Sequence, residues 1–196
     1  MTEQGGYGPD YPIRTERLLL RPITADDAAA MHAYKSDEER VRYVPYGPLE
    51  RADVEERIAT TWSNTVFARE GDAVCLAVED RASGALSGDV VLFWRSVRDR
   101  TGEIGYIFDP RFAGRGYAAE AVGALLELGF EGLGLHRIAA RIDERNTASA
   151  RVVERLGFRR EARFVNSEWF KGEWTTMLVF ALLDEEWRER AGATGR

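Results

Sequence analysis

Two glycines and two arginines near the middle of the chain are spaced to bind an anion. Gly114 and Gly116 let the backbone curl so that several amide N–H groups point at one spot. These amides lie just before a helix that we predict from Ala118, where unpaired N–H groups and the helix dipole favour negative charge. Arg111 and Arg115 add positive charge to the same turn. Glycines alone would predict only a turn, but the two arginines favour a phosphate-binding loop.

A strand and a helix must hold this loop in place. Residues 103–108 are mostly β-branched or aromatic, which predicts a strand. Pro110 ends that strand, because proline has no N–H to donate to a sheet. After the loop, apolar residues recur at helical spacing, at Ala118, Val122, Leu125, Leu126 and Gly129. The predicted order is therefore strand, glycine loop, helix.

A dinucleotide-binding turn is the first alternative. Residues 114–119 fit the pattern G-x-G-x-x-A, which would make the protein a nicotinamide oxidoreductase. In such folds the first glycine directly follows the strand that opens a parallel sheet. Here residues 109–113 separate the strand from the first glycine, and the motif lies past the midpoint of the chain. The context therefore argues against this alternative.

Length and composition limit the class of protein. With 196 residues, 31% of them charged and 44% hydrophobic, we expect one domain over residues 13–190 after a flexible tail over residues 1–12. The single cysteine, Cys75, excludes an intramolecular disulfide and fits the cytoplasm. No apolar run is long enough for a membrane span. The net charge of −6 argues against nucleic acid as the main partner and fits a cationic amine only weakly.

The order of the predicted elements indicates an α/β or α+β protein. Helices are expected from Thr24, over 49–62, from Ala118, over 146–156 and, in a short form, over 184–190. Strands are expected over 17–22, 74–78, 88–93, 103–108, 137–142, 158–165 and 175–183. Early hairpins followed by a βαβα stretch predict a mixed sheet with helices on both faces.

Three motifs in this order resemble the GNAT superfamily of N-acetyltransferases, and most closely its RimJ/RimL branch. The first is Arg111-x-x-Gly114-x-Gly116, followed by Tyr-Ala-Ala-Glu-Ala at residues 117–121. The second is Asn-Thr-Ala-Ser at 146–149, continuing to Gly-Phe at 157–158. The third is Gly-Glu-Trp at 172–174. The resemblance extends from residue 15 to residue 187 and implies a mixed, mostly antiparallel central sheet with helices on both faces.

The resemblance implies acetyl-CoA as the cosubstrate. The pyrophosphate would be held by the loop and by the helix start that follows it. The pantetheine arm would pair with the backbone of residues 107 and 108 like an added strand. The residues that the family pattern assigns to the cofactor are Ile107, Phe108, Arg111, Gly114, Arg115, Gly116, Tyr117, Ala118 and Asn146. Asn146 also fits the N-cap of a helix, and the two roles are compatible.

The same resemblance implies direct attack of a neutral amine on the thioester. Glu103, which opens the predicted strand, is the candidate general base, although a charge at a strand end is also commonly just solvated. Many family members place a tyrosine as general acid where this chain has Val153. The RimJ/RimL pattern points instead to Ser149 as a hydrogen-bond donor to the leaving thiolate, and a serine bonded to a helix carbonyl is an equal alternative. The oxyanion would accept an N–H near residue 107 or 108.

The acceptor amine stays open at this point. Protein N-termini, antibiotic amines and polyamines are all compatible, with Tyr43, Tyr46, Trp94 and Trp169 as candidates for the acceptor wall. His32 and His136 are isolated, so we expect no metal site. The other functional hypotheses are transfer of a longer acyl chain and a non-catalytic acyl-CoA-binding sensor or interaction module on the same fold. Monomer and homodimer are both compatible with the sequence.

Overall fold

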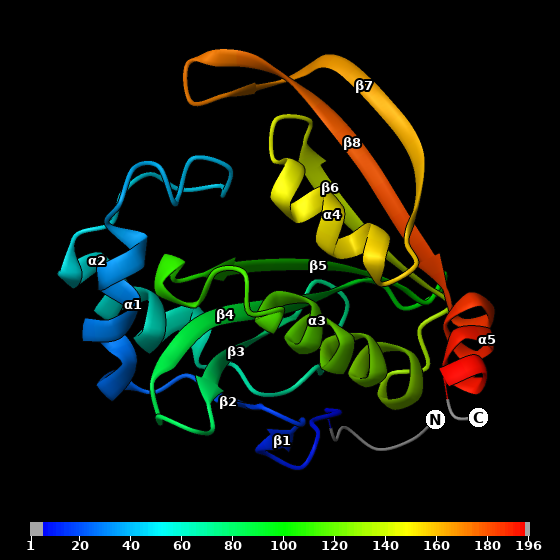
Figure 1. The fold of residues 1–196 in the computed structure, drawn as a ribbon, viewed down its shortest axis with the longest axis horizontal. Coiled ribbons are helices and arrows are strands. Elements are labelled where there is room, and N and C mark those ends of the chain that lie inside the picture. The colour runs from blue at the N-terminus through cyan, green and yellow to red at the C-terminus, as the bar shows by residue number, and fades with distance from the viewer. Residues whose placement is uncertain (1–5, 195–196) are drawn as a thin grey trace.

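Eight strands and five α-helices form between residues 6 and 194, the part of the chain that the computed structural model describes (Figure 1). The strands are β1 Ile13–Arg14, β2 Leu18–Pro22, β3 Ala73–Asp80, β4 Leu86–Ser96, β5 Thr101–Phe108, β6 Arg137–Asp143, β7 Arg159–Phe170 and β8 Glu173–Leu183. The helices are α1 Ala28–Lys35, α2 Arg51–Arg57, α3 Tyr117–Glu127, α4 Thr147–Arg155 and α5 Asp184–Thr194. A π-helical turn extends α2 over Ile58–Trp62, and another extends α3 over Leu128–Gly132.

The strands form one sheet in the order β1-β2-β3-β4-β5-β6-β8-β7. Neighbouring strands in residues 6–194 are antiparallel except β5 and β6, which run parallel. The prediction of a mixed, mostly antiparallel sheet is therefore confirmed.

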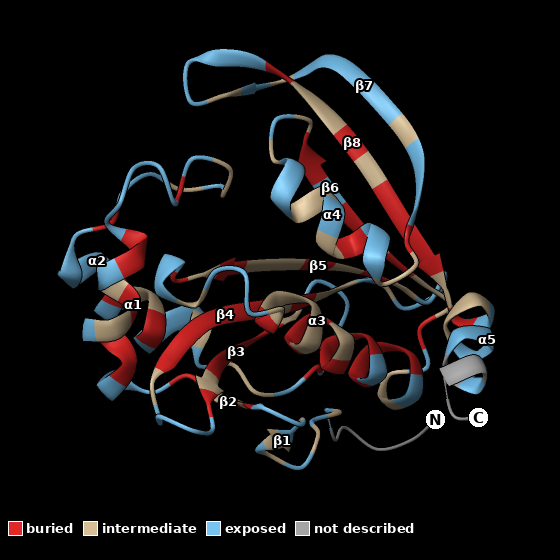
Figure 2. Ribbon diagram, in the orientation of Figure 1, coloured by how far each residue is buried: buried red, intermediate tan, exposed pale blue. Residues whose placement is uncertain are grey.

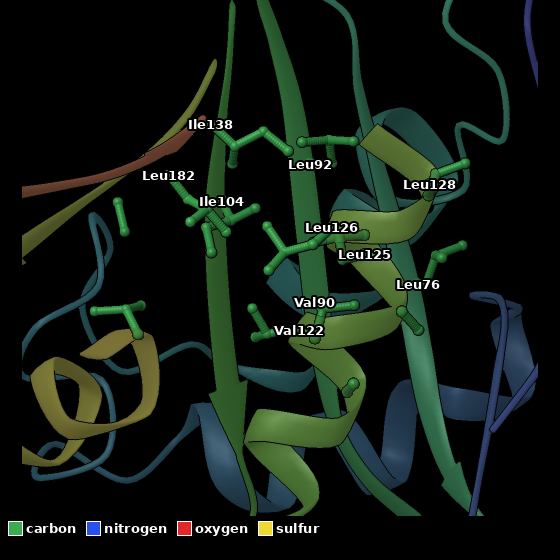
Figure 3. Close-up of a cluster of buried hydrophobic side chains, with 14 of the residues drawn as sticks. Leu76, Val90, Leu92, Ile104, Val122, Leu125, Leu126, Leu128, Ile138 and Leu182 are labelled. Atoms are coloured by element: carbon green, nitrogen blue, oxygen red, sulfur yellow. The ribbon is translucent and has the colours of Figure 1, made fainter. Parts of the chain in front are cut away.

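Alternation along the strands divides the core into two layers. Val90 and Leu92 of β4 face the first layer, where they pack with Val122, Leu125 and other residues of α3 (Figure 3). Helix α4 joins the same layer through Val153. The second layer covers the opposite face and consists of α1, α2 and the sheet residues beneath them, including Cys75, Ala77 and Ile107. Helices therefore cover both faces, as predicted.

The N-terminal segment shows how far the predicted tail extends. Residues 1–5 of that tail lie outside the described residues. Tyr7, however, exchanges two backbone hydrogen bonds with Phe67, at 2.8 and 2.7 Å. The Tyr11 hydroxyl donates to the Thr65 carbonyl at 3.0 Å, and both tyrosines pack on the first core layer. These contacts argue against a loose tail over residues 6–12.

The β7–β8 hairpin projects from the rest of the sheet (Figure 2). Most of β7 is exposed, whereas β8 buries the residues that pair with β6. Bulges interrupt the β7–β8 pairing after Arg160 and again between Phe164 and Glu168. Because bulges bend a strand and increase its twist, they account for the curvature of this hairpin.

Candidate active site

The parallel pair β5–β6 separates after three residue pairs. Thr101, Gly102 and Glu103 pair with β6, and from Ile104 to Phe108 no β6 residue of the described chain pairs with this edge of β5. The other edge of β5 stays paired with β4 along its whole length. One side chain bridges the separated elements, because the Tyr106 hydroxyl donates to the Ser149 carbonyl of α4 at 3.0 Å. An extended chain can therefore add to β5 where β6 has turned away.

The open edge of β5 leads directly into the glycine loop. Asp109 caps a short 3₁₀ turn at Pro110–Phe112. The backbone N–H groups of Arg111 and Phe112 donate to Asp109 and are therefore already bonded inside the loop. Gly114 and Gly116 then adopt φ of 75° and 78°, the left-handed region that glycine enters without a steric penalty. Helix α3 starts at the next residue, so its first amides are donors that the helix itself leaves unpaired. This geometry agrees with the predicted phosphate-binding loop.

The two loop arginines lie in different surroundings. Arg111 turns back onto Asp109, with its Nε 2.8 Å from the carboxylate, although most of its side chain is exposed. Burial alone would raise the pKa of Asp109, but hydrogen bonds from Arg111 outweigh it and hold that pKa below its usual value. The Arg115 guanidinium lies 5.1 Å from the centre of the Phe112 ring. Arg111 is thus partly neutralised, whereas Arg115 stacks on the loop's own aromatic ring.

A third arginine at the loop comes from the N-terminal segment and was missed by sequence reasoning. The Arg17 guanidinium donates to the Arg115 carbonyl at 2.8 Å and to the Glu120 carboxylate at 2.7 Å. Thr15 supports the same carboxylate through its hydroxyl at 2.6 Å. Local pattern carries no signal for this contact, because 103 residues separate Arg17 from Glu120.

Helix α4 places two predicted residues next to the open edge of β5. Asn146 is the N-cap, and its side-chain oxygen accepts from the Ser149 amide at 3.1 Å. The Asn146 amide group keeps its N–H donors for another partner. Ser149 is half-buried in the first turn, and its carbonyl accepts from Tyr106. Val153 is fully buried in the core, so it leaves no polar group at the position where many family members carry a tyrosine.

Glu103 lies at the last pair before β5 and β6 separate. It pairs with Ala139 of β6 on one side and with Phe93 of β4 on the other. Its carboxylate is 3.1 Å from the Arg95 guanidinium, and 23% of its side chain is exposed. A partly accessible carboxylate at this point is placed to accept a proton from a bound amine.

The predicted aromatic residues of the acceptor wall do not all come together. Tyr46 belongs to the second core layer, where its ring centre is 6.1 Å from that of Trp62. Tyr43 lies in the same α1–α2 loop and faces the Arg145 guanidinium at 5.8 Å. Trp94 packs on the first core layer against Phe67, because it lies on the same face of β4 as Val90 and Leu92, away from α1 and α2. Trp94 is therefore separated from Tyr43 and Tyr46.

Trp169 lies on the far hairpin. It is 63% exposed on β7, and its ring meets that of Trp174 edge to face at 5.4 Å. At the tip of this hairpin, the Lys171 ammonium donates to the Val41 carbonyl at the start of the loop that carries Tyr43. The hairpin tip and the α1–α2 loop therefore touch although 130 residues separate them in the sequence (Figure 1).

Three further observations concern metal ligands, the surroundings of His136 and membrane-spanning helices. No group of three or more His, Cys, Asp or Glu side chains between residues 6 and 194 is arranged to hold a metal ion. His136 lies 3.0 Å from the Asp184 carboxylate at the start of α5. None of the helices in this part of the chain is long and apolar enough to cross a membrane.

Comparison with known proteins identifies the arrangement. The family model described as "Acetyltransferase (GNAT) domain" matches residues 17–159. An uncharacterized N-acetyltransferase of Bacillus subtilis, YnaD, is 35% identical over 175 residues, which cover 89% of this chain and 98% of that protein. A GNAT-family acetyltransferase structure from Bacillus anthracis superposes with a TM-score of 0.79 at 34% identity, covering 89% of this chain and 99% of the other. The Escherichia coli [ribosomal protein uS5]-alanine N-acetyltransferase is 25% identical over 192 residues, which cover 93% of this chain and 97% of that protein.

Proposed function

The chain belongs to the GNAT acetyltransferase family and is an N-acetyltransferase, and we propose that it transfers the acetyl group of acetyl-CoA to a primary amine at the open edge of β5. Members of this family use acetyl-CoA. The relatives named N-acetyltransferases favour this enzyme over a non-catalytic sensor, and the five residues between β5 and the first glycine disfavour a nicotinamide oxidoreductase. The free, buried thiol of Cys75 supports a cytoplasmic location as part of the proposal.

The proposed binding mode rests on one observation. The edge of β5 that is not paired with β6 leads directly into the glycine loop at the start of α3. The pantetheine arm would add to this edge beside Ile107 and Phe108, as a strand adds to a sheet. The pyrophosphate would then meet the amides that begin α3, from Gly114 to Ala118. Asn146 would donate its free amide hydrogens to the arm from the opposite side.

The proposed reaction begins with proton removal. An ammonium group has no lone pair, so Glu103 accepts a proton from it, directly or through a water molecule. The neutral amine then attacks the thioester carbonyl carbon, so that a C–N bond forms and the C–S bond breaks, and the nitrogen, which carries a positive charge after the attack, releases its second proton to water. Backbone N–H groups near Ile107 and Phe108 stabilise the negative oxygen, and the Ser149 hydroxyl donates a hydrogen bond to the leaving thiolate, which takes its proton from solvent.

The acceptor in this proposal is a protein N-terminus or a small-molecule amine. The name of the E. coli relative states an alanine of a ribosomal protein as its acceptor. Short peptides with a free N-terminal alanine or serine are therefore the first acceptors to test, beside polyamines and antibiotic amines.

The test is release of free CoA thiol from acetyl-CoA in the presence of single amines. The wild type should release thiol with one class of acceptor. Glu103→Gln should lower kcat/KM roughly 10²- to 10⁴-fold without weakening CoA binding, since only the base is lost. Glu79→Gln is the matched control, because Glu79 is also a strand carboxylate paired with an arginine and also 23% exposed. Equal activity of Glu103→Gln and Glu79→Gln would remove Glu103 from the mechanism.

A further inference from the structure

A buried lysine lies beneath the α1–α2 loop, and the proposed reaction does not use it. The sequence contains 27 lysines and arginines, of which only Lys35 and Lys171 are lysines. Lys35 is the last residue of α1 and is 0% exposed. Its ammonium is 2.7 Å from the carboxylate of Asp89 on β4, which is also buried. A buried ion pair between a helix and a strand needs an explanation in any fold, because burying charge is costly.

Three side chains around the pair interact with the Asp89 carboxylate or the Lys35 ammonium. The Tyr34 hydroxyl donates to Asp89 at 2.7 Å, and the Cys75 thiol lies 3.8 Å from the same carboxylate. The Lys35 ammonium lies 4.6 Å from the centre of the Trp62 ring, within reach of a cation–π interaction. Burial is the largest single effect and would lower the pKa of Lys35, but the charge of Asp89 together with the interactions of Tyr46 outweighs it and raises that pKa. The Lys35 ammonium is thus kept charged although it is buried.

Lys35 closes the α1–α2 loop at both ends. Its ammonium donates to the Tyr46 hydroxyl at 3.0 Å, near the end of the loop. Its backbone carbonyl accepts from the Leu49 amide at 3.0 Å, just before α2. The loop over residues 36–48 therefore begins directly after Lys35, and its other end is hydrogen-bonded to the same residue.

Asp89 connects this loop to the strand where the cosubstrate is proposed to bind. Asp89 is the register partner of Ile107, so its backbone lies directly beside the end of β5. The route from the loop to the proposed pantetheine site therefore passes through only two side chains, those of Lys35 and Asp89. A buried pair of this kind adds little to stability but can fix one arrangement among several.

We propose that Lys35 and Asp89 are positioning residues for the acceptor amine, which hold the Tyr46 side of the α1–α2 loop at a fixed distance from β5. The proposal rests on the proposed function, since it assumes that this loop forms part of the acceptor site. Neither residue touches the reacting atoms. Their loss should therefore affect amine binding and orientation, and leave CoA binding at the glycine loop that follows β5 intact.

The main variant is the double substitution Lys35→Met with Asp89→Asn, which removes both charges and nearly keeps the volume. Lys35→Met alone would leave a buried carboxylate unpaired and is expected to unfold the protein more readily. The double variant should raise the KM for the amine, or lower kcat, roughly 10- to 100-fold, because small displacements of a positioned reactant are costly. The Kd for CoA, measured by calorimetry, should not change.

Tyr34→Phe is the matched control. It removes another hydrogen bond to Asp89 from the same helix, whereas no hydrogen bond joins the Tyr34 hydroxyl to the described residues of the loop. Tyr46→Phe removes the contact between the loop and Lys35. We expect the amine KM to rise in Tyr46→Phe and to stay unchanged in Tyr34→Phe.

A second readout does not depend on activity. Amide hydrogen exchange of residues 36–49 should speed up in the double variant, whereas exchange in β4 and β5 should not. A double variant with normal exchange in this loop and normal kinetics would overturn the proposal, as would equal losses of amine and CoA binding. If the wild type acetylates no amine but the loop exchange still changes as expected, the proposed function fails while the anchoring role of Lys35 stands and its link to the acceptor is withdrawn.

Discussion

At the scale of single residues, a glycine substitution at the start of α3 can distinguish a role in backbone conformation from a role in cosubstrate binding. Gly116 has φ of 78°, and a Cβ added to it would meet no atom closer than 3.5 Å. Substitution by alanine therefore costs about 1–2 kcal/mol of left-handed backbone strain rather than a clash. Gly84, in the β3–β4 turn, has φ of 70° and open space around it. It offers the same strain outside the loop at the start of α3.

We expect Gly116→Ala and Gly84→Ala to lose similar stability in urea unfolding and to differ in CoA binding. The strain in Gly116→Ala is relieved by turning the amides that begin α3, so the Kd for CoA should rise by about tenfold, which corresponds to roughly 1.4 kcal/mol. Gly84→Ala should bind CoA as the wild type does. Calorimetric titration with CoA measures this, and an unchanged Kd in Gly116→Ala would remove the loop from the binding site.

Tyr106 gives a pH prediction at the same scale. Burial is the main cause that raises its pKa, to about 12, so Tyr106 stays a neutral hydrogen-bond donor to Ser149 near pH 7. The unfolded chain binds fewer protons than the folded one between the ordinary tyrosine pKa of about 10 and this raised value. Stability therefore falls as pH rises through this window. In Tyr106→Phe the free energy of unfolding should fall less steeply with pH, by up to about 1.4 kcal/mol per pH unit. Urea unfolding at a series of alkaline pH values measures this slope. Parallel pH profiles for the two proteins would contradict the assignment.

At the scale of elements, the N-terminal segment fastens the loop at the start of α3. Arg17 and Arg81 both hold this segment, since Arg81 donates to the carbonyls of Thr15 and Glu16. Only Arg17 reaches the Arg115 carbonyl and Glu120. The two arginines therefore make a matched pair, in which one variant releases the loop and the other does not.

We expect Arg17→Ala to weaken CoA binding by about tenfold, the size of one lost charged hydrogen bond. Arg81→Ala should leave CoA binding unchanged. Turnover of acetyl-pantetheine, which has no phosphate groups, should not distinguish the two variants. A loss of acetyl-pantetheine turnover in Arg17→Ala alone would mean that Arg17 supports the fold of the site rather than its phosphate end.

The elements were more predictable than their contacts. The strand at 103–108, the glycine loop and the following helix were predicted from local signals. Alternation alone does not tell which face of a strand meets which helices, so the sequence did not show that Trp94 and Tyr46 pack in different core layers. The contacts of Glu103 with Arg95 and of Lys35 with Asp89 depend on strand register, for which the sequence carries no local code.

At the scale of the whole molecule, the separation of β5 from β6 divides the structure into two arms. One arm carries β1 to β5 with α1, α2 and α3, and the other carries β6, β7 and β8 with α4 (Figure 1). Besides the packing of α4 in the first core layer, side-chain contacts among the described residues connect the arms beyond the separation. Tyr106 reaches Ser149, Arg145 lies over Tyr43, and Lys171 reaches the Val41 carbonyl. The last of these joins the tip of the exposed hairpin to the loop that Lys35 anchors at its base.

Lys171 therefore tests whether the arms are held together at their outer ends. Lys171→Met removes the ammonium that donates to Val41 while keeping most of the side-chain volume. We expect Tm to fall by only about 2–4 °C, the effect of roughly 1 kcal/mol in a chain of this length. Amide exchange should rise on both arms together, in residues 41–43 and 169–172, because each segment loses the partner that orders it.

Arg163→Met is the control for Lys171→Met, since Arg163 lies on the same hairpin and pairs with Glu144 near its base, without contacting the α1–α2 loop. It should leave exchange in residues 41–43 unchanged. If Lys171→Met also leaves that exchange unchanged, the hairpin tip does not restrain the loop in solution. In that case Lys35 rather than the hairpin tip restrains the loop, and the effect of the Lys35 and Asp89 double variant on amine KM should be larger, because the hairpin tip does not limit the displacement of Tyr46.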